Sequence, residues 1–254
     1  MKKLNVGAKK VALGMFISLF SIAAYSQFYI NVGGGYNLGI ANQSLLNNYE
    51  RTNNIEKIEN VKTSLGKGAN FGLNIGYMFN GNIGIDLQCS YLLGDENAGE
   101  SKSNYTFFST NYYDYEKISV KNQIIRINPS LIIASGFDKL DPYARFGVIL
   151  GFGSITYTDL YEEYENNLLE DKVIEKWKFN GGMAFGLSSA LGLMYHISDL
   201  ISVYGELDLV SMSYAPTKGV MTEYTINGAD KLPDLTTDAK EIEFLDEITY
   251  DDDN

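Results

Sequence analysis

The sequence is poor in residues that bind metals or form covalent cross-links. It contains one cysteine, Cys89, and one histidine, His196, in 254 residues. A lone thiol cannot close an internal disulfide, and these two residues are too few for a Cys/His zinc site. Lys and Arg total 20 against 32 Asp and Glu, which leaves no basic patch to neutralise nucleic-acid phosphates. We therefore expect no metal, no cofactor and no nucleic-acid partner.

Long hydrophobic runs are also missing, except near the N-terminus. There, four lysines precede the apolar run 11–24, and Ala24-Tyr25-Ser26 places small residues before Gln27. This pattern is typical of a cleaved secretory signal peptide; the alternative, an anchoring helix, needs about 20 apolar residues. We expect a signal peptide over residues 1–26 and one exported domain over residues 27–254.

Proline is scarce, with 4 residues, whereas glycine (25) and tyrosine (19) are abundant. After the signal peptide, apolar and polar residues alternate with the period of two that is typical of β-strands. In one segment, for example, Ile83, Ile85 and Leu87 alternate with Gly84 and Asp86. Seven such segments cover residues 28–40, 69–79, 83–93, 122–133, 143–153, 179–195 and 201–209.

The polar faces of these segments distinguish between two kinds of β protein. They consist mainly of Gly, Asn and Ser with a few charges. A soluble sandwich or lipocalin-like barrel would expose many Lys and Glu on this face, whereas a narrow membrane-barrel interior requires small residues and paired charges. The segment lengths also suit a tilted membrane-crossing strand. We therefore predict an all-β, antiparallel up-and-down transmembrane β-barrel with its apolar face toward lipid.

The connections between the segments alternate between short and long. The short ones are residues 80–81, 135–142 and 196–200, and the long ones are 41–66, 95–117, 154–176 and 215 onward. Short periplasmic turns and long outer loops are typical of outer-membrane barrels, which have even strand numbers in bacteria. We therefore expect eight strands, of which seven are recognisable.

The eighth strand is not evident near the C-terminus. Ile248-Thr249-Tyr250 is too short, and the acidic residues 251–254 that follow cannot cross lipid. Because an open barrel would leave strand edges unpaired in hydrocarbon, we expect that the domain lacks its closing strand.

The start of the mature chain, Phe28-Tyr29-Ile30-Asn31-Val32-Gly33-Gly34-Gly35-Tyr36, resembles small OmpA/OmpX-type outer-membrane β-barrels, as do the signal peptide and the Gly-Asn inner face. The resemblance covers about residues 27–214. It implies a location in the outer membrane of a Gram-negative envelope, with lipid, lipopolysaccharide and the barrel-assembly machinery as partners. The family's terminal aromatic strand, which the assembly machinery recognises, and an OmpA-like peptidoglycan-binding domain are both missing from this sequence.

Five charged residues fall on the predicted inner face: Asp86, Arg126, Arg145, Glu206 and Asp208. Charges inside a narrow lumen are tolerated only when they are paired. Our hypothesis is therefore a structural network of ion pairs that keeps the barrel filled; the alternative is the gate of a pore.

The function predicted from these patterns is that of a structural or surface-interaction protein, adhesin-like or envelope-stabilising, whose acidic outer loops bind an extracellular ligand. The alternative is a narrow porin-like channel or a small-solute binding barrel. A lipid A-modifying enzyme is a third hypothesis, but His196 falls in a predicted periplasmic turn, away from the outer rim where such enzymes place a general base. We therefore expect no catalytic residues and no enzyme activity.

Overall fold

The computed structural model describes residues 27–40, 43–53 and 55–245. The predicted signal peptide and the C-terminal segment 248–254 lie outside these residues. Within these residues, fourteen strands form one sheet, and two short helices lie between the last two strands. The strands are β1 (Gln27–Asn37), β2 (Gln43–Thr52), β3 (Ile55–Thr63), β4 (Gly68–Met78), β5 (Ile83–Gly94), β6 (Asn97–Phe107), β7 (Thr110–Ala134), β8 (Leu140–Glu165), β9 (Leu168–Asn180), β10 (Ala184–His196), β11 (Ser202–Ser213), β12 (Lys218–Ile226), β13 (Ala229–Asp230) and β14 (Glu241–Glu243), and the helices are η2 (Leu232–Asp234) and α2 (Thr237–Lys240).

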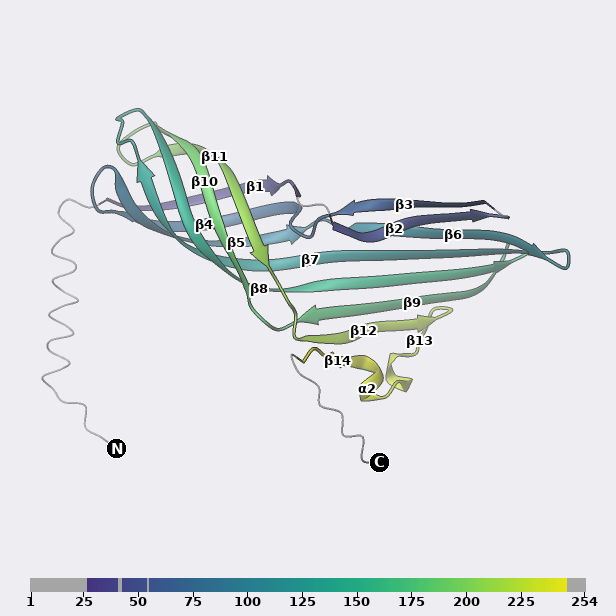
Figure 1. Ribbon diagram of the computed structural model, residues 1–254. Helices are drawn as coiled ribbons and strands as arrows, with labels where there is room; N and C mark the ends of the chain where they lie inside the picture. Colours follow the sequence, from purple (N-terminus) through teal and green to yellow (C-terminus); the bar gives the residue numbers. More distant parts are fainter. Residues whose placement is uncertain (1–26, 41–42, 54, 246–254) are drawn as a thin grey trace, which may run out of the picture.

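A curved wall of seven antiparallel strands makes up one half of the molecule (Figure 1). Its order is β1-β4-β5-β7-β8-β10-β11, so each strand pairs with the next of the seven predicted segments. Tight connections join β4 to β5 and β10 to β11, where Phe79 and Ile197 donate backbone hydrogen bonds to Ile83 and Ile201. The antiparallel order of the predicted segments is therefore confirmed, and the sixth of them enters the wall from Ala184 onward as β10.

The burial of the wall is inverted relative to a soluble protein. In β5, Asp86 and Ser90 are buried at 4% exposure, whereas Ile85 and Leu87 are about half exposed, at 51% and 50%. Along β7, buried and exposed residues alternate from Asn122 to Ile133 in the same way. Since burying charge while exposing aliphatic side chains is costly in water, this wall is built for an apolar surrounding. The predicted outward direction of the apolar face is confirmed.

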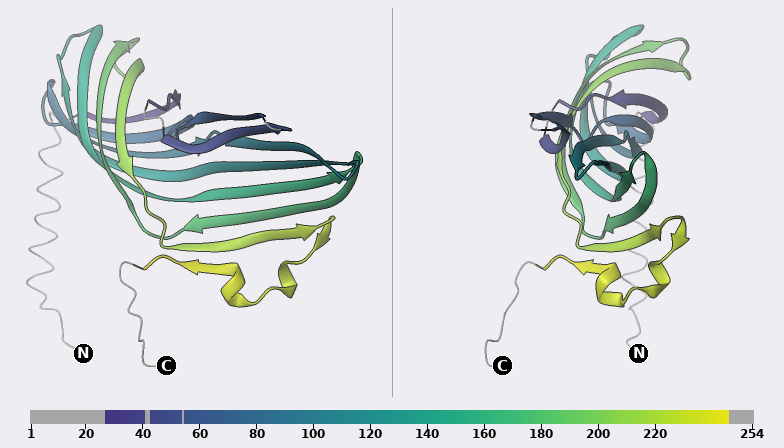
Figure 2. Two further views of the ribbon diagram at one scale, coloured as in Figure 1. Left: turned by 45° about the vertical axis from the view of Figure 1, so that its right-hand side comes forward. Right: turned by 90° about the vertical axis from the view of Figure 1, so that its right-hand side faces the viewer.

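The other half of the molecule is an extension of the same sheet, as Figure 2 shows from two sides. The strands β7 and β8 have 25 and 26 residues and run through both halves without a break. At ~3.3 Å per residue each is about 80 Å long, far beyond the ~30 Å of a hydrocarbon core. Beside them, β5, β10 and β11 are continued by β6, β9 and β12 after short breaks. We call β2, β3, β6, β9, β12 and the distal halves of β7 and β8 the extension sheet.

Two expectations about the barrel are wrong. The sheet has fourteen strands rather than eight, because segments expected as outer loops pair as strands along β7 and β8. The sheet is also not closed: within the part of the chain that is described, β1 pairs only with β4, and β11 pairs only with β10. The two ends still approach each other, since a Cβ on Gly33 of β1 would lie 2.1 Å from the Tyr204 hydroxyl of β11.

The predicted segment 179–195 is two strands rather than one. Gly181 and Gly182 both have positive φ, 77° and 67°, a conformation that favours glycine. This turn shifts the pairing with β8 by one residue, so that Phe179 in β9 and Phe185 in β10 point to opposite faces despite their even spacing. Alternation alone could not detect the change.

No described helix is long and apolar enough to cross a membrane.

The inverted burial predicts that a charge on the outward face is tolerated only away from the middle of the wall. We expect Phe146→Arg, which replaces a 53% exposed outward residue of β8, to lower the unfolding free energy in lipid vesicles by about 2–4 kcal/mol. The matched control Thr158→Arg, farther along β8, should change it by less than about 0.5 kcal/mol. Urea unfolding followed by the fluorescence of Trp177, the single tryptophan, measures both; equal losses would contradict the assignment of faces.

Candidate functional site

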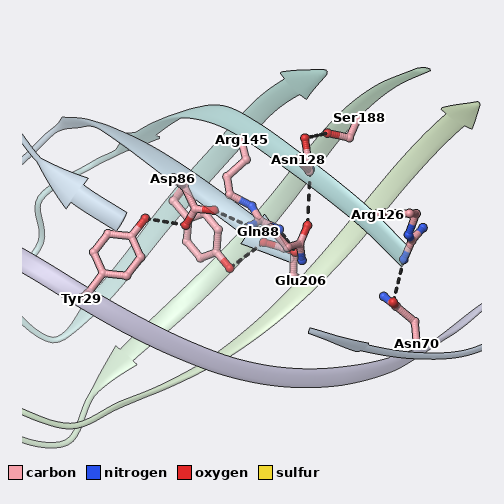
Figure 3. A network of polar contacts seen from close by, with 10 residues as sticks. Tyr29, Asn70, Asp86, Gln88, Arg126, Asn128, Arg145, Ser188 and Glu206 are labelled. Atoms are coloured by element: carbon pink, nitrogen blue, oxygen red, sulfur yellow. Dashed lines mark hydrogen bonds and ion pairs between the residues drawn. The ribbon is translucent and has the colours of Figure 1, made fainter. Parts of the chain in front are cut away.

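Arg145 is the central residue of a polar network on the inward face of the wall. It projects inward from β8 and is 4% exposed. Its Nη1 lies 3.4 Å from Asp86 Oδ1 on β5, and its Nη2 lies 2.5 Å from Glu206 Oε1 on β11 (Figure 3). With its amide oxygen turned toward Arg145, Asn74 accepts a further bond from Nη1 at 2.9 Å. One guanidinium therefore links distant parts of the wall, and its charge is balanced by two carboxylates.

Two tyrosines complete this network. The Tyr29 hydroxyl donates to Asp86 Oδ2 at 2.8 Å, and the Tyr143 hydroxyl donates to Glu206 Oε2 at 2.9 Å. Each ring lies over a glycine of the neighbouring strand: a Cβ would come within 2.0 Å of the Tyr29 ring at Gly76 and 2.2 Å of the Tyr143 ring at Gly192. The glycines of the inner face therefore make room for aromatic rings that hold the carboxylates.

Arg126 belongs to a second polar group, farther along the lumen. Its Nη2 donates to Asn70 Oδ1 at 2.6 Å and its Nε to Ser90 Oγ at 3.2 Å. Nearby, Asn128 donates to Gln88 Oε1 at 3.3 Å and accepts from Ser188. This group is held by neutral partners, in contrast to the ion pairs around Arg145.

The structure thus brings together three of the five predicted lumen charges: Asp86, Arg145 and Glu206. Asp208 is exposed on β11 and forms no ion pair with any described residue. Arg145 and Arg126 act on its carboxylate only through their charge, without a direct contact. The prediction did not include Tyr29 and Tyr143, although a tyrosine on a face of Gly and Asn was a usable signal.

The residues considered for other chemistry lie elsewhere. Cys89 is exposed on the outward face of β5. His196 is half-buried at the end of β10, where its Nδ1 lies 2.7 Å from Ser202 Oγ. Trp177 lies buried on the inward side, stacked on Phe179.

Most of the extension sheet, from β6 across β7, β8 and β9 to β12, separates opposite charges onto its two faces, whereas Arg51 of β2 pairs with Ser103 on the inward side. The pairing of β7 with β8 keeps one register from Ala134 to Tyr112, so the inward face of the wall continues onto the extension sheet. Within β6, β9, β12 and the distal halves of β7 and β8, all fully described, this inward face carries no Lys or Arg. Its acids are Asp114, Glu116, Asp159, Glu163, Glu165, Asp171 and Glu175.

Aromatic side chains lie among these acids. Tyr157 and Trp177 face each other across β8 and β9, the Tyr157 hydroxyl donates to Asp159, and Trp177 Nε1 donates to Glu175. Burial, with Asp159, Glu116 and Glu175 nearby, raises the pKa of Tyr157 to about 12. Burial, and then the charges of Glu116 and Glu175, also raise the pKa of Asp159. The inward face is therefore an aromatic surface of strongly negative potential.

The outward face of the extension sheet has the opposite character. Its glutamates are paired, for example Glu162 with Lys172 at 2.8 Å and Glu223 with Lys176 at 2.8 Å. The lysines of this face are Lys102, Lys117, Lys121, Lys172, Lys176, Lys178 and Lys218.

The lumen network predicts a large penalty for removing its central cation. In Arg145→Met, Asp86 and Glu206 would stay buried without a counter-charge, and we expect a loss of about 3–5 kcal/mol in unfolding free energy. The control Arg51→Met removes an exposed pair with Glu56 at 3.9 Å and should cost at most about 1 kcal/mol. Adding Asp86→Asn and Glu206→Gln to Arg145→Met should recover most of the loss in urea unfolding; no recovery would show that packing, and not charge balance, is what Arg145 supplies.

Comparison with known proteins agrees with this geometry. The model of the outer membrane protein beta-barrel domain family matches residues 11–234. No curated protein and no solved structure matches the chain significantly. The family match covers most of the chain, including all seven strands of the wall and most of the extension sheet. The chain therefore belongs to the outer membrane protein beta-barrel domain family.

Proposed function

We propose that this protein is a surface-interaction barrel whose extension sheet projects from the cell and binds a positively charged partner on its inward face. The observation that carries the proposal is the separation of charge from β6 across β7, β8 and β9 to β12, where the inward side holds acids and aromatic rings and no Lys or Arg. A partner with cationic groups complements both features, through carboxylates and through the faces of aromatic rings.

The direction of projection follows from the family architecture. Barrels of the outer membrane have short turns on the periplasmic side and long segments on the outer side. The short turns of this chain lie at one end of the wall, at residues 79–83 and 196–202, and the extension sheet lies at the other. The proposal therefore places the extension sheet outside the cell.

The extension sheet is preorganised for binding. Its hairpins close in tight turns with positive φ at Asn166 and Asn167, 49° and 67°, and at Asn227 and Gly228, 52° and 80°, values typical of the type I′ turns that Asn and Gly favour. The register of β7 and β8 is regular up to the tip. A surface that is already ordered loses little conformational entropy when a partner binds.

The site also has an electrostatic reason to accept a cation. Asp159 is partly withdrawn from water and lies near the like charges of Glu116 and Glu175, and its pKa is raised for these reasons. A cationic group beside Asp159 would replace the lost solvation and offset the repulsion.

The channel alternative receives less support from the lumen. Arg145 and its partners Asp86, Glu206, Tyr29 and Tyr143 occupy the middle of the lumen, and narrow barrels are filled by their side chains. Planar-bilayer recordings test the alternative directly: steady conductance from the intact chain, abolished by filling variants such as Ser188→Phe, would favour a channel.

The binding proposal is tested with a nona-arginine peptide and the full chain in lipid nanodiscs. The double variant Asp159→Asn/Glu175→Gln should weaken binding about tenfold, because it removes charge from the inward face. The control Glu162→Gln/Glu223→Gln removes the same charge from the outward face and should change affinity less than about twofold. Equal losses in surface plasmon resonance would mean that only net charge matters, and would contradict a site on the inward face.

The same site predicts a dependence on pH. Because the pKa of Asp159 is raised, its carboxylate is fully charged only above that pKa and is neutralised as the pH falls through it. Peptide binding should therefore decline at a higher pH than an ordinary aspartate would give. In Asp159→Asn this part of the decline should vanish, as measured by isothermal titration at a series of pH values; an unchanged profile would remove Asp159 from the site.

A further inference from the structure

The lysines of the outward face fall into two groups that differ in their partners. Farther along the sheet, beginning one row beyond Lys178, Lys102, Lys172 and Lys176 are paired with Glu100, Glu162 and Glu223 at 2.7–2.8 Å. Lys117 lies 3.8 Å from Glu96. The lysines nearest the wall, Lys121, Lys178 and Lys218, form no ion pair with any carboxylate in the described ranges. We call these three residues the lysine belt.

The lysine belt lies directly beyond the apolar band of the wall. On β7, Lys121 follows the outward residues Ile125 and Gln123, and on β8, its partner Thr156 follows Phe152, which is 47% exposed. Thr156 in turn pairs with Lys178 of β9. The first polar row on the outward face after the hydrocarbon-facing side chains is Gln123, Ser154, Asn180 and Lys218, and Lys121, Thr156 and Lys178 form the next row. The lysine belt thus lies at the polar edge of the apolar band, where lipid headgroups are expected.

The spacing of the belt allows its ammonium groups to act together. Lys121 and Lys178 flank Thr156 on either side, and strands two apart are separated by about 10 Å. Lys178 pairs with Val220, so Lys218 is its diagonal neighbour on β12, at about 7–8 Å. Lys178 and Lys218 are also exposed. A ligand with more than one phosphate can therefore contact two or three lysines at once.

We propose that the lysine belt binds the phosphate groups of lipopolysaccharide in the outer leaflet. The belt borders the lipid-facing band, its lysines form no ion pair with a described carboxylate, and their charge complements a phosphorylated glycolipid. The chain as a whole is acidic, with net charge -12, so general attraction to anions does not explain this cluster. The proposal rests on the outer-membrane location and not on the cationic partner of the inward face.

The test measures retention of bis-phosphorylated lipid A by the full chain in mixed micelles, using native mass spectrometry. The triple variant Lys121→Gln/Lys178→Gln/Lys218→Gln should weaken retention about tenfold or more. The control Lys102→Gln/Lys117→Gln/Lys172→Gln removes the same charge from paired lysines and should stay within about twofold. Dephosphorylated lipid A should bind the unaltered chain as weakly as lipid A binds the triple variant.

Several outcomes would overturn the proposal. Equal effects of the two triple variants, or equal retention of dephosphorylated lipid A, would show that the belt does not recognise phosphate. Inorganic phosphate binding as tightly as lipid A would identify a free-anion site and exclude a lipid site. The folding of the triple variant is checked by the change in its gel mobility on boiling, which a folded barrel shows. If the triple variant does not fold, retention is measured for the exposed single variants Lys178→Gln and Lys218→Gln, each with an expected loss of about threefold. Unchanged retention in both would contradict the proposal.

Discussion

A strand that crosses hydrocarbon must give each backbone N–H and C=O a partner on a neighbouring strand, because no water is present to replace one. This constraint organises the whole molecule. It sets the antiparallel ladder of the wall, and it forces the side chains to alternate between lipid and lumen. It also makes the lumen the place where polar residues can be buried, and Arg145, between Asp86 and Glu206, balances the charges collected there.

The side chains of the extension sheet alternate between its two faces as they do in the wall, but the surroundings differ. Once β7 and β8 leave the membrane, neither face needs to be apolar, and from β6 to β12 the two faces are instead distinguished by the sign of their charge. The inward face holds carboxylates among aromatic rings, and the outward face holds lysines. Each face continues one surface of the wall, so the extension sheet presents one kind of chemistry toward the barrel axis and another toward the surrounding lipid.

The sequence was sufficient to predict the wall, because alternation is strict where one face meets lipid and Gly, Asn and Ser fill the other. It was also sufficient to place Asp86, Arg145 and Glu206 on one face. It was not sufficient to predict the extension sheet, where both faces are polar and the alternation of hydrophobicity disappears. The pairing also shifts by one residue at residues 95–96 and 181–183, so the charge separation becomes visible only when the register is known.

The uninterrupted course of β7 and β8 has a mechanical consequence. Where other strands break near the edge of the wall, these two keep one pairing register from Ala134 and Tyr143 to Tyr112 and Glu165, and the ladder is interrupted only beside Pro129, which has no N–H to donate. A force applied at the tip along the strand axis would load these bonds in parallel, as shear, whereas a sideways force at a hairpin break would open bonds one after another. The β7–β8 ribbon is thus a stiff tether between the tip and the membrane anchor, with compliance confined to the breaks beside it.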